Sequence, residues 1–179
     1  MRQHISIIEA AESSQELKML PLEFDTDALW PSMSDHCVNV HYNTLTRRYF
    51  EKYEQTGDLF QKAGALLHND HWWPLLKSYD ESNKPSSSVV DRINKVHGSL
   101  RNFKKSIREA AMLIQGNGWV LIMEDLALQP IQNHLWVPGI AMAVDVWEHA
   151  TVDWDFDRTA YIDNLWHVLN WDHLESKLS

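Results

Sequence analysis

Two helical periods separated by a short turn constrain this chain most strongly. Apolar side chains recur every three or four residues over residues 34–54 and again over 59–77. Ser34 is a plausible start of the first period, and residues 56–58 (Thr-Gly-Asp) form the turn between the two. Two helices joined so closely predict an antiparallel helical hairpin.

The second half of the chain contains short apolar runs between further helices. The polar stretch 78–88 is the best linker, and helices are expected at 89–97 and 100–115, with Ser99 as N-cap of the latter. Three runs then predict short buried strands at 119–123, 126–129 and 139–144. Helices at 161–169 and 171–178 close the chain. Helices, then strands, then helices indicate an α+β fold.

Composition excludes several classes of protein. The 179 residues, 44% of them hydrophobic, suffice for one domain or for two small lobes sharing a core. A net charge of −9 without a long basic run argues against a nucleic-acid interface. We find no membrane span, signal peptide or transit peptide, and the single cysteine, Cys37, fits a reducing compartment. A cytoplasmic protein is therefore expected.

The string Asp-Val-Trp-Glu-His-Ala at residues 145–150 carries the chemistry. Asp145 and His149 are both suitable ligands for a first-row metal. For the isolated pair, a capping aspartate and a surface histidine are the simpler explanation. The aromatic and acidic residues between them make the string more informative than the pair.

This string resembles the metal-binding signature of iron/manganese superoxide dismutases. Segments 99–104, 116–119 and 169–171 also resemble family segments in the same order, and the resemblance extends from about residue 21 to 178. It implies an N-terminal helical hairpin packed on a C-terminal α/β lobe with a small three-stranded antiparallel sheet. We therefore expect an N-terminal extension at 1–19, a helical-hairpin domain at 20–82 and a C-terminal α/β domain at 83–179.

The resemblance implies four metal ligands on separate segments. These are His41, His68, Asp145 and His149. His68 is chosen because it stands four residues before Trp72, as in the family, and His71 is its rival.

Further residues are implied to surround the metal. Tyr49, eight residues after His41, matches the tyrosine at the mouth of the substrate funnel. The aromatic wall would comprise Trp72, Trp119 and Trp147.

A hydrogen-bonding residue beside the metal can come from two places in the family. One is Gly64, which has no side chain and resembles manganese-type members. The other is best matched by His134, with Gln132 as a rival. His134 and Tyr49 are thus the candidate catalytic side chains.

The implied activity is that of an antioxidant oxidoreductase. Superoxide is disproportionated to oxygen and hydrogen peroxide at one iron or manganese ion per subunit, with a lean to iron. Zinc could not serve because it has no redox chemistry. Glu148 would bond the ligand histidine of a partner subunit, which implies a homodimer with Glu148 and His149 at its interface. Arg158 most resembles the arginine that steers superoxide.

Three departures keep other functions open. Leu45 replaces a funnel histidine, Thr151 and Val152 replace paired tyrosines, and the 27 residues from His41 to His68 indicate a trimmed hairpin. A structural or assembly subunit with this fold and little activity is the main alternative. A non-haem iron oxygenase is a third, although such sites use only two histidines.

Overall fold

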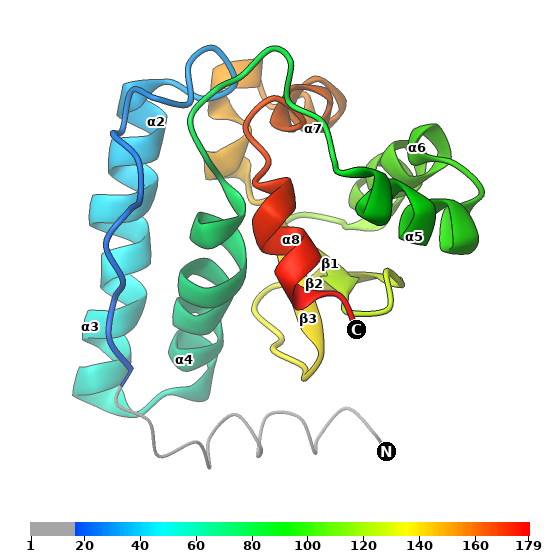
Figure 1. Ribbon diagram of the computed structural model, residues 1–179. Coiled ribbons are helices and arrows are strands. Elements are labelled where there is room, and N and C mark those ends of the chain that lie inside the picture. Colours follow the sequence, from blue (N-terminus) through cyan, green and yellow to red (C-terminus); the bar gives the residue numbers. More distant parts are fainter. Residues whose placement is uncertain (1–16) are drawn as a thin grey trace.

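The computed structural model describes residues 17–179 (Figure 1). Of the predicted N-terminal extension, residues 1–16 lie outside the described part, and residues 17–19 belong to no helix or strand. Helices come first along the described chain, a small antiparallel sheet follows after two more helices, and helices close it. The predicted α+β fold is confirmed.

The first arm of the hairpin is a continuous helix with a change of winding in its middle. It comprises α2 (Asp35–Asn39), the π-helical segment η1 (Val40–Thr46) and α3 (Arg47–Thr56). Ser34 is its N-cap, as predicted, and its hydroxyl accepts from the Cys37 amide at 3.1 Å. The helix ends at Gly57, whose φ of +67° favours glycine.

The second arm returns antiparallel to the first. It comprises α4 (Leu59–Leu66), the π-helical η2 (Leu67–Trp72) and the 3-10 turn η3 (Trp73–Leu75). The Asp58 carboxylate caps it by accepting from the Phe60 amide at 2.9 Å. This arm ends slightly earlier than predicted, because Leu76 is extended and forms a β-bridge with Leu169. In Figure 1, α3 and α4 lie side by side.

Two helices connect the hairpin to the sheet. They are α5 (Ser87–His97) and α6 (Leu100–Leu113). The predicted linker is slightly shorter than expected, because the Ser86 hydroxyl accepts from the Val89 amide and starts α5 at Ser87. Ser99 caps α6 as predicted. Helix α6 packs on β1, β2 and α7.

The predicted three-stranded antiparallel sheet is confirmed. Its strands are β1 (Gly118–Met123), β2 (Leu128–Gln132) and β3 (Ile140–Asp145), in the order β2-β1-β3. In the central strand β1, Trp119 stands opposite Ile131 on one side and Asp145 on the other. Strand β3 is buried along its length and delivers Asp145 to its end.

Strand β2 lies further along the chain than predicted. The run 126–129 was expected to be a strand, but Leu126 has φ +66° and lies in the turn, and the strand continues to Gln132. Pro130 lies inside it, opposite Val120. Proline lacks an amide donor and is tolerated here because β2 is an edge strand.

The C-terminal segment also begins and ends differently from the prediction. After β3 come η4 (Glu148–Ala150), η5 (Val152–Trp154), α7 (Arg158–Leu165) and α8 (Trp171–Lys177). The helix predicted at 161–169 begins at Arg158, because the Asp157 carboxylate accepts from the amides of Thr159 and Ala160. It ends at Leu165, before the bridge that Leu169 forms with Leu76.

One hydrophobic core joins the hairpin to the C-terminal lobe. The same buried cluster contains Leu67 and Trp72 of the second arm together with Trp119 and Val144 of the sheet. The boundary predicted between residues 82 and 83 falls in the turns before α5, and a division into separate domains stays a prediction.

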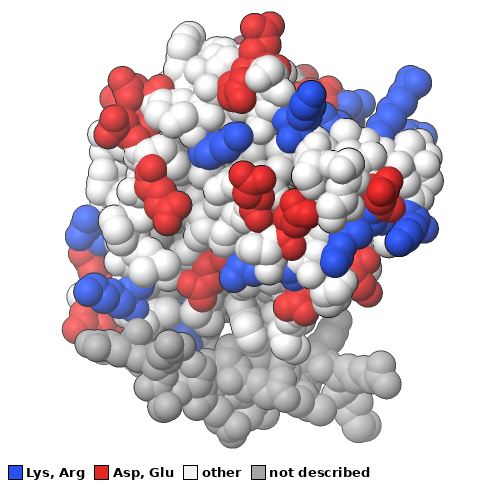
Figure 2. All heavy atoms as spheres, in the orientation of Figure 1, with Lys and Arg blue, Asp and Glu red and all other residues white. Residues whose placement is uncertain are grey.

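The surface carries charges of both signs. On the face in Figure 2, Lys and Arg side chains are interspersed with Asp and Glu. Within residues 17–179, no helix is long and apolar enough to cross a membrane.

Candidate metal centre

His41 lies in the π-helical segment of the first arm, with 1% of its surface exposed. A π-helical turn takes an extra residue and shifts the direction of the side chains that follow, and such turns are frequent at functional sites. The segment is held by a short polar chain: Thr46 Oγ1 donates to the His41 carbonyl at 2.9 Å, and Trp73 Nε1 donates to Thr46 Oγ1 at 3.0 Å.

His68 lies in the π-helical segment of the second arm and is fully buried. Its Nδ1 is 2.7 Å from the carbonyl of Gly64, one turn earlier. A carbonyl only accepts, so Nδ1 carries the proton and Nε2 keeps its lone pair for a metal. The rival, His71, is not one of the four clustered donors.

Asp145 and His149 come from the end of the sheet. Asp145 is fully buried at the last position of β3, and its Oδ1 accepts from the Trp147 amide at 2.8 Å. This bond turns Oδ2 toward the hairpin. His149 follows on η4, with 22% of its side chain exposed.

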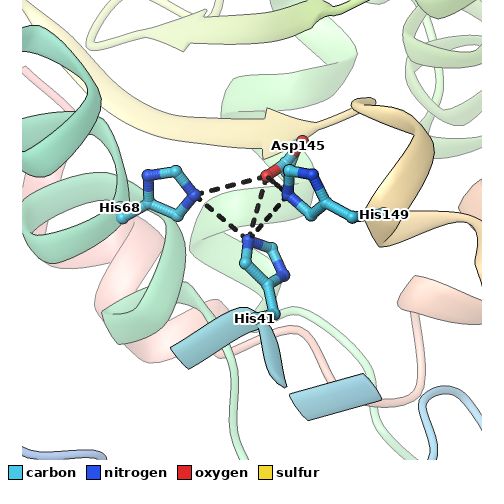
Figure 3. A group of neighbouring side chains, drawn as sticks. All are labelled: His41, His68, Asp145 and His149. Carbon is cyan, nitrogen blue, oxygen red and sulfur yellow. Dashed lines mark hydrogen bonds and ion pairs between the residues drawn. The ribbon is translucent and has the colours of Figure 1, made fainter. Parts of the chain in front are cut away.

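The four side chains point toward one another from four segments (Figure 3). His41 Nε2 is 3.1 Å from His68 Nε2, 3.2 Å from His149 Nε2 and 3.2 Å from Asp145 Oδ2. Asp145 Oδ2 is also 3.5 Å from His68 Nε2 and 3.3 Å from His149 Nε2. All four donor atoms lie within 4.8 Å of one another.

These separations suit a metal ion. An ion about 2.1 Å from each donor separates two donors by about 3.0 Å at a right angle and about 3.6 Å at 120°. Five of the six donor–donor distances are 3.1 to 3.5 Å and lie in that range. Nitrogen and carboxylate oxygen donors suit iron and manganese.

The electrostatics of the cluster also suit a cation. Burial lowers the pKa of His41 to about 3, so its imidazole is neutral near pH 7. Burial alone would raise the pKa of Asp145, but the adjacent imidazoles His149, His41 and His68 outweigh it and hold that pKa well below the usual range. The cluster therefore offers at least one neutral imidazole, that of His41, and one ionised carboxylate.

Indole rings enclose the cluster. Trp72 stacks on His41 with ring centroids 6.2 Å apart, and Trp119 meets His68 edge-on at 4.8 Å. Both indoles are fully buried. The sequence reasoning missed Trp73, whose ring lies 4.8 Å from that of His41 and closes the side next to Thr46. Its place directly after Trp72, on the same helical arm, was the available signal.

The predicted funnel tyrosine lies against the cluster. The Tyr49 ring stacks on His68 at 5.2 Å and meets His134 edge-on at 4.6 Å. A Cβ at Gly64 would lie 2.8 Å from Tyr49 Cδ1 and 3.1 Å from His134 Cδ2, so only glycine leaves room for both rings. Burial raises the pKa of Tyr49, so its hydroxyl stays protonated at neutral pH.

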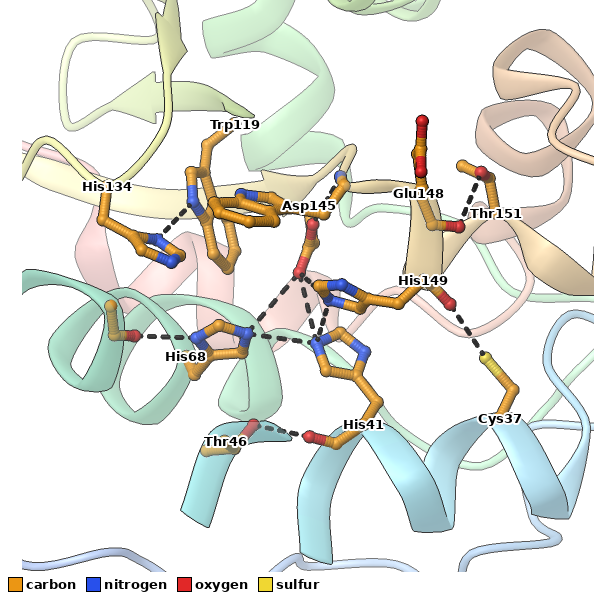
Figure 4. A network of polar contacts seen from close by, with 12 residues as sticks. Cys37, His41, Thr46, His68, Trp119, His134, Asp145, Glu148, His149 and Thr151 are labelled. Carbon is orange, nitrogen blue, oxygen red and sulfur yellow. Dashed lines mark hydrogen bonds and ion pairs between the residues drawn. The ribbon is translucent and has the colours of Figure 1, made fainter. Parts of the chain in front are cut away.

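His134, rather than Gln132, lies beside the cluster. His134 is 6% exposed, stacks on Trp147 at 4.5 Å and accepts from Trp119 Nε1 at 3.1 Å (Figure 4). Gln132 is exposed and donates to the Gln115 carbonyl, so the prediction of Gln132 as a rival was wrong. Gln132 is the exposed last residue of β2, and the chain turns at Asn133, which has φ +57°, before it reaches His134. The sequence reasoning also missed Phe60, which packs on the His134 ring at 4.8 Å.

Arg158 holds the end of another helix. Its guanidinium donates to the carbonyls of Ala111, Ile114 and Gly116, where α6 ends. The Ile114 and Gly116 carbonyls lie beyond the last residue of α6, where no helical amide follows to pair with them, while the Ala111 carbonyl also accepts from the Ile114 amide. The steering role of Arg158 stays a prediction.

The remaining predicted residues lie on the loop after the sheet. Glu148 is exposed, and within residues 17–179 its carboxylate makes no hydrogen bond or ion pair. Thr151, where the family has a tyrosine, is buried, and its hydroxyl donates to the Glu148 carbonyl at 3.1 Å. Val152 is 45% exposed, and Leu45 is half-buried.

Residues 85–177 match the model of the C-terminal domain of iron/manganese superoxide dismutases. The chain belongs to the iron/manganese superoxide dismutase family. An iron superoxide dismutase of Pyrobaculum aerophilum is 29% identical, with 88% of this chain and 90% of the relative covered. A manganese superoxide dismutase of Halobacterium salinarum is 31% identical, covering 89% and 92%. A superoxide dismutase of Aeropyrum pernix named for both metals is 26% identical, covering 93% and 92%.

Family membership accounts for the architecture around the cluster. In this member of the family, the hairpin contributes His41 and His68, and the C-terminal lobe contributes Asp145 and His149. The donors thus meet where the two lobes share their core.

Proposed function

We propose that this chain is a superoxide dismutase, which converts two superoxide anions to oxygen and hydrogen peroxide. His41, His68, Asp145 and His149 would hold one iron or manganese ion, which supplies the one-electron chemistry. The proposal depends on one observation, namely that four metal-binding atoms from four segments lie within 4.8 Å of one another. A purely structural subunit would need no such buried donor set.

His134 and Tyr49 can hold the protons that peroxide formation consumes. His134 Nδ1 accepts from Trp119, so the proton of the neutral ring is on Nε2. That Nε2 is buried and has no partner within residues 17–179, and is thus a free donor beside the cluster. Tyr49 keeps its hydroxyl proton at neutral pH, because burial raises its pKa.

The metal would be iron or manganese, with a lean to iron. Of the three relatives described above, the 29% identical one is named for iron and the 31% identical one for manganese. The 26% identical relative is named for both metals. The donor set does not discriminate between the two ions. The metal content of protein purified from its own source decides this point.

Three finer features belong to the same proposal. Glu148 would bond the ligand histidine of a second copy in a homodimer; its exposed carboxylate and the partly exposed His149 support this. The Glu148→Ala variant should then sediment as a monomer, while the unmodified chain sediments at twice the mass. Arg158 would steer superoxide toward the metal. The protein would act in the cytoplasm, and cell fractionation tests this location.

A metal-reconstitution assay tests the function. The purified chain is loaded with iron or manganese, and superoxide decay is followed for the unmodified protein and for His149→Ala. His36→Ala is the matched control, because His36 is an exposed histidine on α2 outside the cluster. The proposal expects activity in the unmodified and control proteins and its loss in His149→Ala. A metal-loaded, folded protein without activity would refute it.

A further inference from the structure

The segment before His41 is tied to the segment after His149. Ser34 N donates to Asp153 Oδ2 at 2.6 Å, and Ser34 Oγ donates to Asp153 Oδ1 at 2.8 Å. Both carboxylate oxygens of Asp153 therefore accept hydrogen bonds from Ser34, which belongs to the opposite lobe. We call this pair the Ser34–Asp153 clamp.

Two weaker contacts lie on either side of the clamp. Trp154 Nε1 donates to the Ser32 carbonyl at 3.0 Å, and Cys37 Sγ lies 3.6 Å from the His149 carbonyl (Figure 4). The loop that carries His149 thus meets the start of the helix that carries His41 at three successive points.

The clamp acts at a favourable place on the helix. Ser34 is the N-cap of α2, and the first amides of a helix have no partner within it and form the positive end of its dipole. Bonds from an amide and a hydroxyl to an ionised carboxylate are stronger than neutral ones. Asp153 therefore satisfies a helix terminus that a neutral side chain would satisfy less well.

In each of the two segments that it joins, the clamp is close in sequence to a metal-donor histidine. Ser34 stands seven residues before His41, about two helical turns, and Asp153 stands four residues after His149. The two imidazoles face each other with Nε2 atoms 3.2 Å apart. A shift of the loop against the helix therefore changes a donor–donor distance directly.

We propose that Asp153 is a positioning residue for the metal centre, which sets the distance between His41 and His149 by fixing the 149–154 loop on the N-terminus of α2. This rests on the proposed function, because both histidines are taken as ligands. Asp153 itself is not one of the four clustered donors.

The experiment compares metal release from three loaded variants. Asp153→Ala removes the clamp, and Asp153→Asn keeps one acceptor oxygen without the charge. Asp157→Ala is the matched control, since Asp157 is an exposed aspartate four residues away that also accepts two bonds, but only from its own helix. Release to excess chelator is timed, and the visible absorption or electron paramagnetic resonance spectrum of the bound metal is recorded.

The proposal expects Asp153→Ala to release metal roughly tenfold faster with an altered metal spectrum, the low end of what outer ligand-supporting contacts contribute. Asp153→Asn should release metal at a rate between those of Asp153→Ala and the unmodified protein. Asp157→Ala should match the unmodified protein in both release rate and spectrum. Unchanged release and spectrum in Asp153→Ala, or equal acceleration in Asp157→Ala, would overturn it. If Asp153→Ala does not fold, the Asp153→Asn comparison decides. Failure of the unmodified protein to bind metal would instead refute the proposed function.

Discussion

Replacing Gly64 with alanine sets a gain in helix propensity against a steric cost at the candidate site. The new methyl would lie 2.8 Å from Tyr49 Cδ1 and 3.1 Å from His134 Cδ2. Carbon atoms pack best at about 3.5 to 4.0 Å, so the Tyr49 ring has to move. Alanine gains about 1 kcal/mol over glycine inside a helix, whereas overpacking costs about 1 to 3 kcal/mol. We expect the free energy of unfolding to fall by about 1 kcal/mol.

Urea denaturation of the metal-free protein measures this change. Gly57→Ala is the contrasting control: Gly57 has φ +67° but nothing within 4 Å of a new Cβ, so its cost comes from the backbone alone. In a Tyr49→Ala background the cost of Gly64→Ala should shrink, because the nearest clashing ring is gone, while that of Gly57→Ala should not. Superoxide decay should slow in Gly64→Ala only. If Gly64→Ala raised the stability by the full helix-propensity gain, the packing argument would be wrong.

Two further predictions concern the buried polar groups. In the metal-free protein, burial lowers the pKa of His41 and of His134 from 6.5 to about 3, so below pH 6.5 the unfolded chain binds more protons than the folded one. Urea denaturation at pH 7 and pH 5 should show stability falling with acidity, by up to about 1.4 kcal/mol per pH unit for each histidine; unchanged stability would contradict this. Trp73→Phe removes the donor to Thr46 Oγ1 and should cost about 1 to 2 kcal/mol by the same assay, whereas no loss would show that the bond contributes nothing.

Local signals in the sequence located most helices and strands. The hydroxyls of Ser34 and Ser99 cap the helices that follow them, and Gly57 ends a helix in a conformation that other residues adopt at a cost. These signals act within a few residues, so a single sequence reveals them. The β2 strand was misplaced because Pro130 suppresses a strand prediction, and only the sheet order shows that β2 is an edge.

The prediction that the four donors converge depended on the family resemblance. Spacing alone cannot bring residues 41, 68 and 145 together, because the distance between them is set by packing of the hairpin on the sheet. The π-helical winding at His41 and His68 was likewise invisible, since an apolar period does not distinguish α from π turns. Phe60 was missed because its contact with His134 spans both lobes.

Locating the bound ion tests the central claim most directly. Crystals of the protein loaded with iron or manganese would be measured on both sides of each metal absorption edge, and the metal per chain would be counted in solution. We predict one ion per chain, at a single anomalous peak among His41, His68, Asp145 and His149, with the stoichiometry lost in His41→Ala and kept in His36→Ala. A peak elsewhere, or a folded protein that binds no ion, would contradict the account.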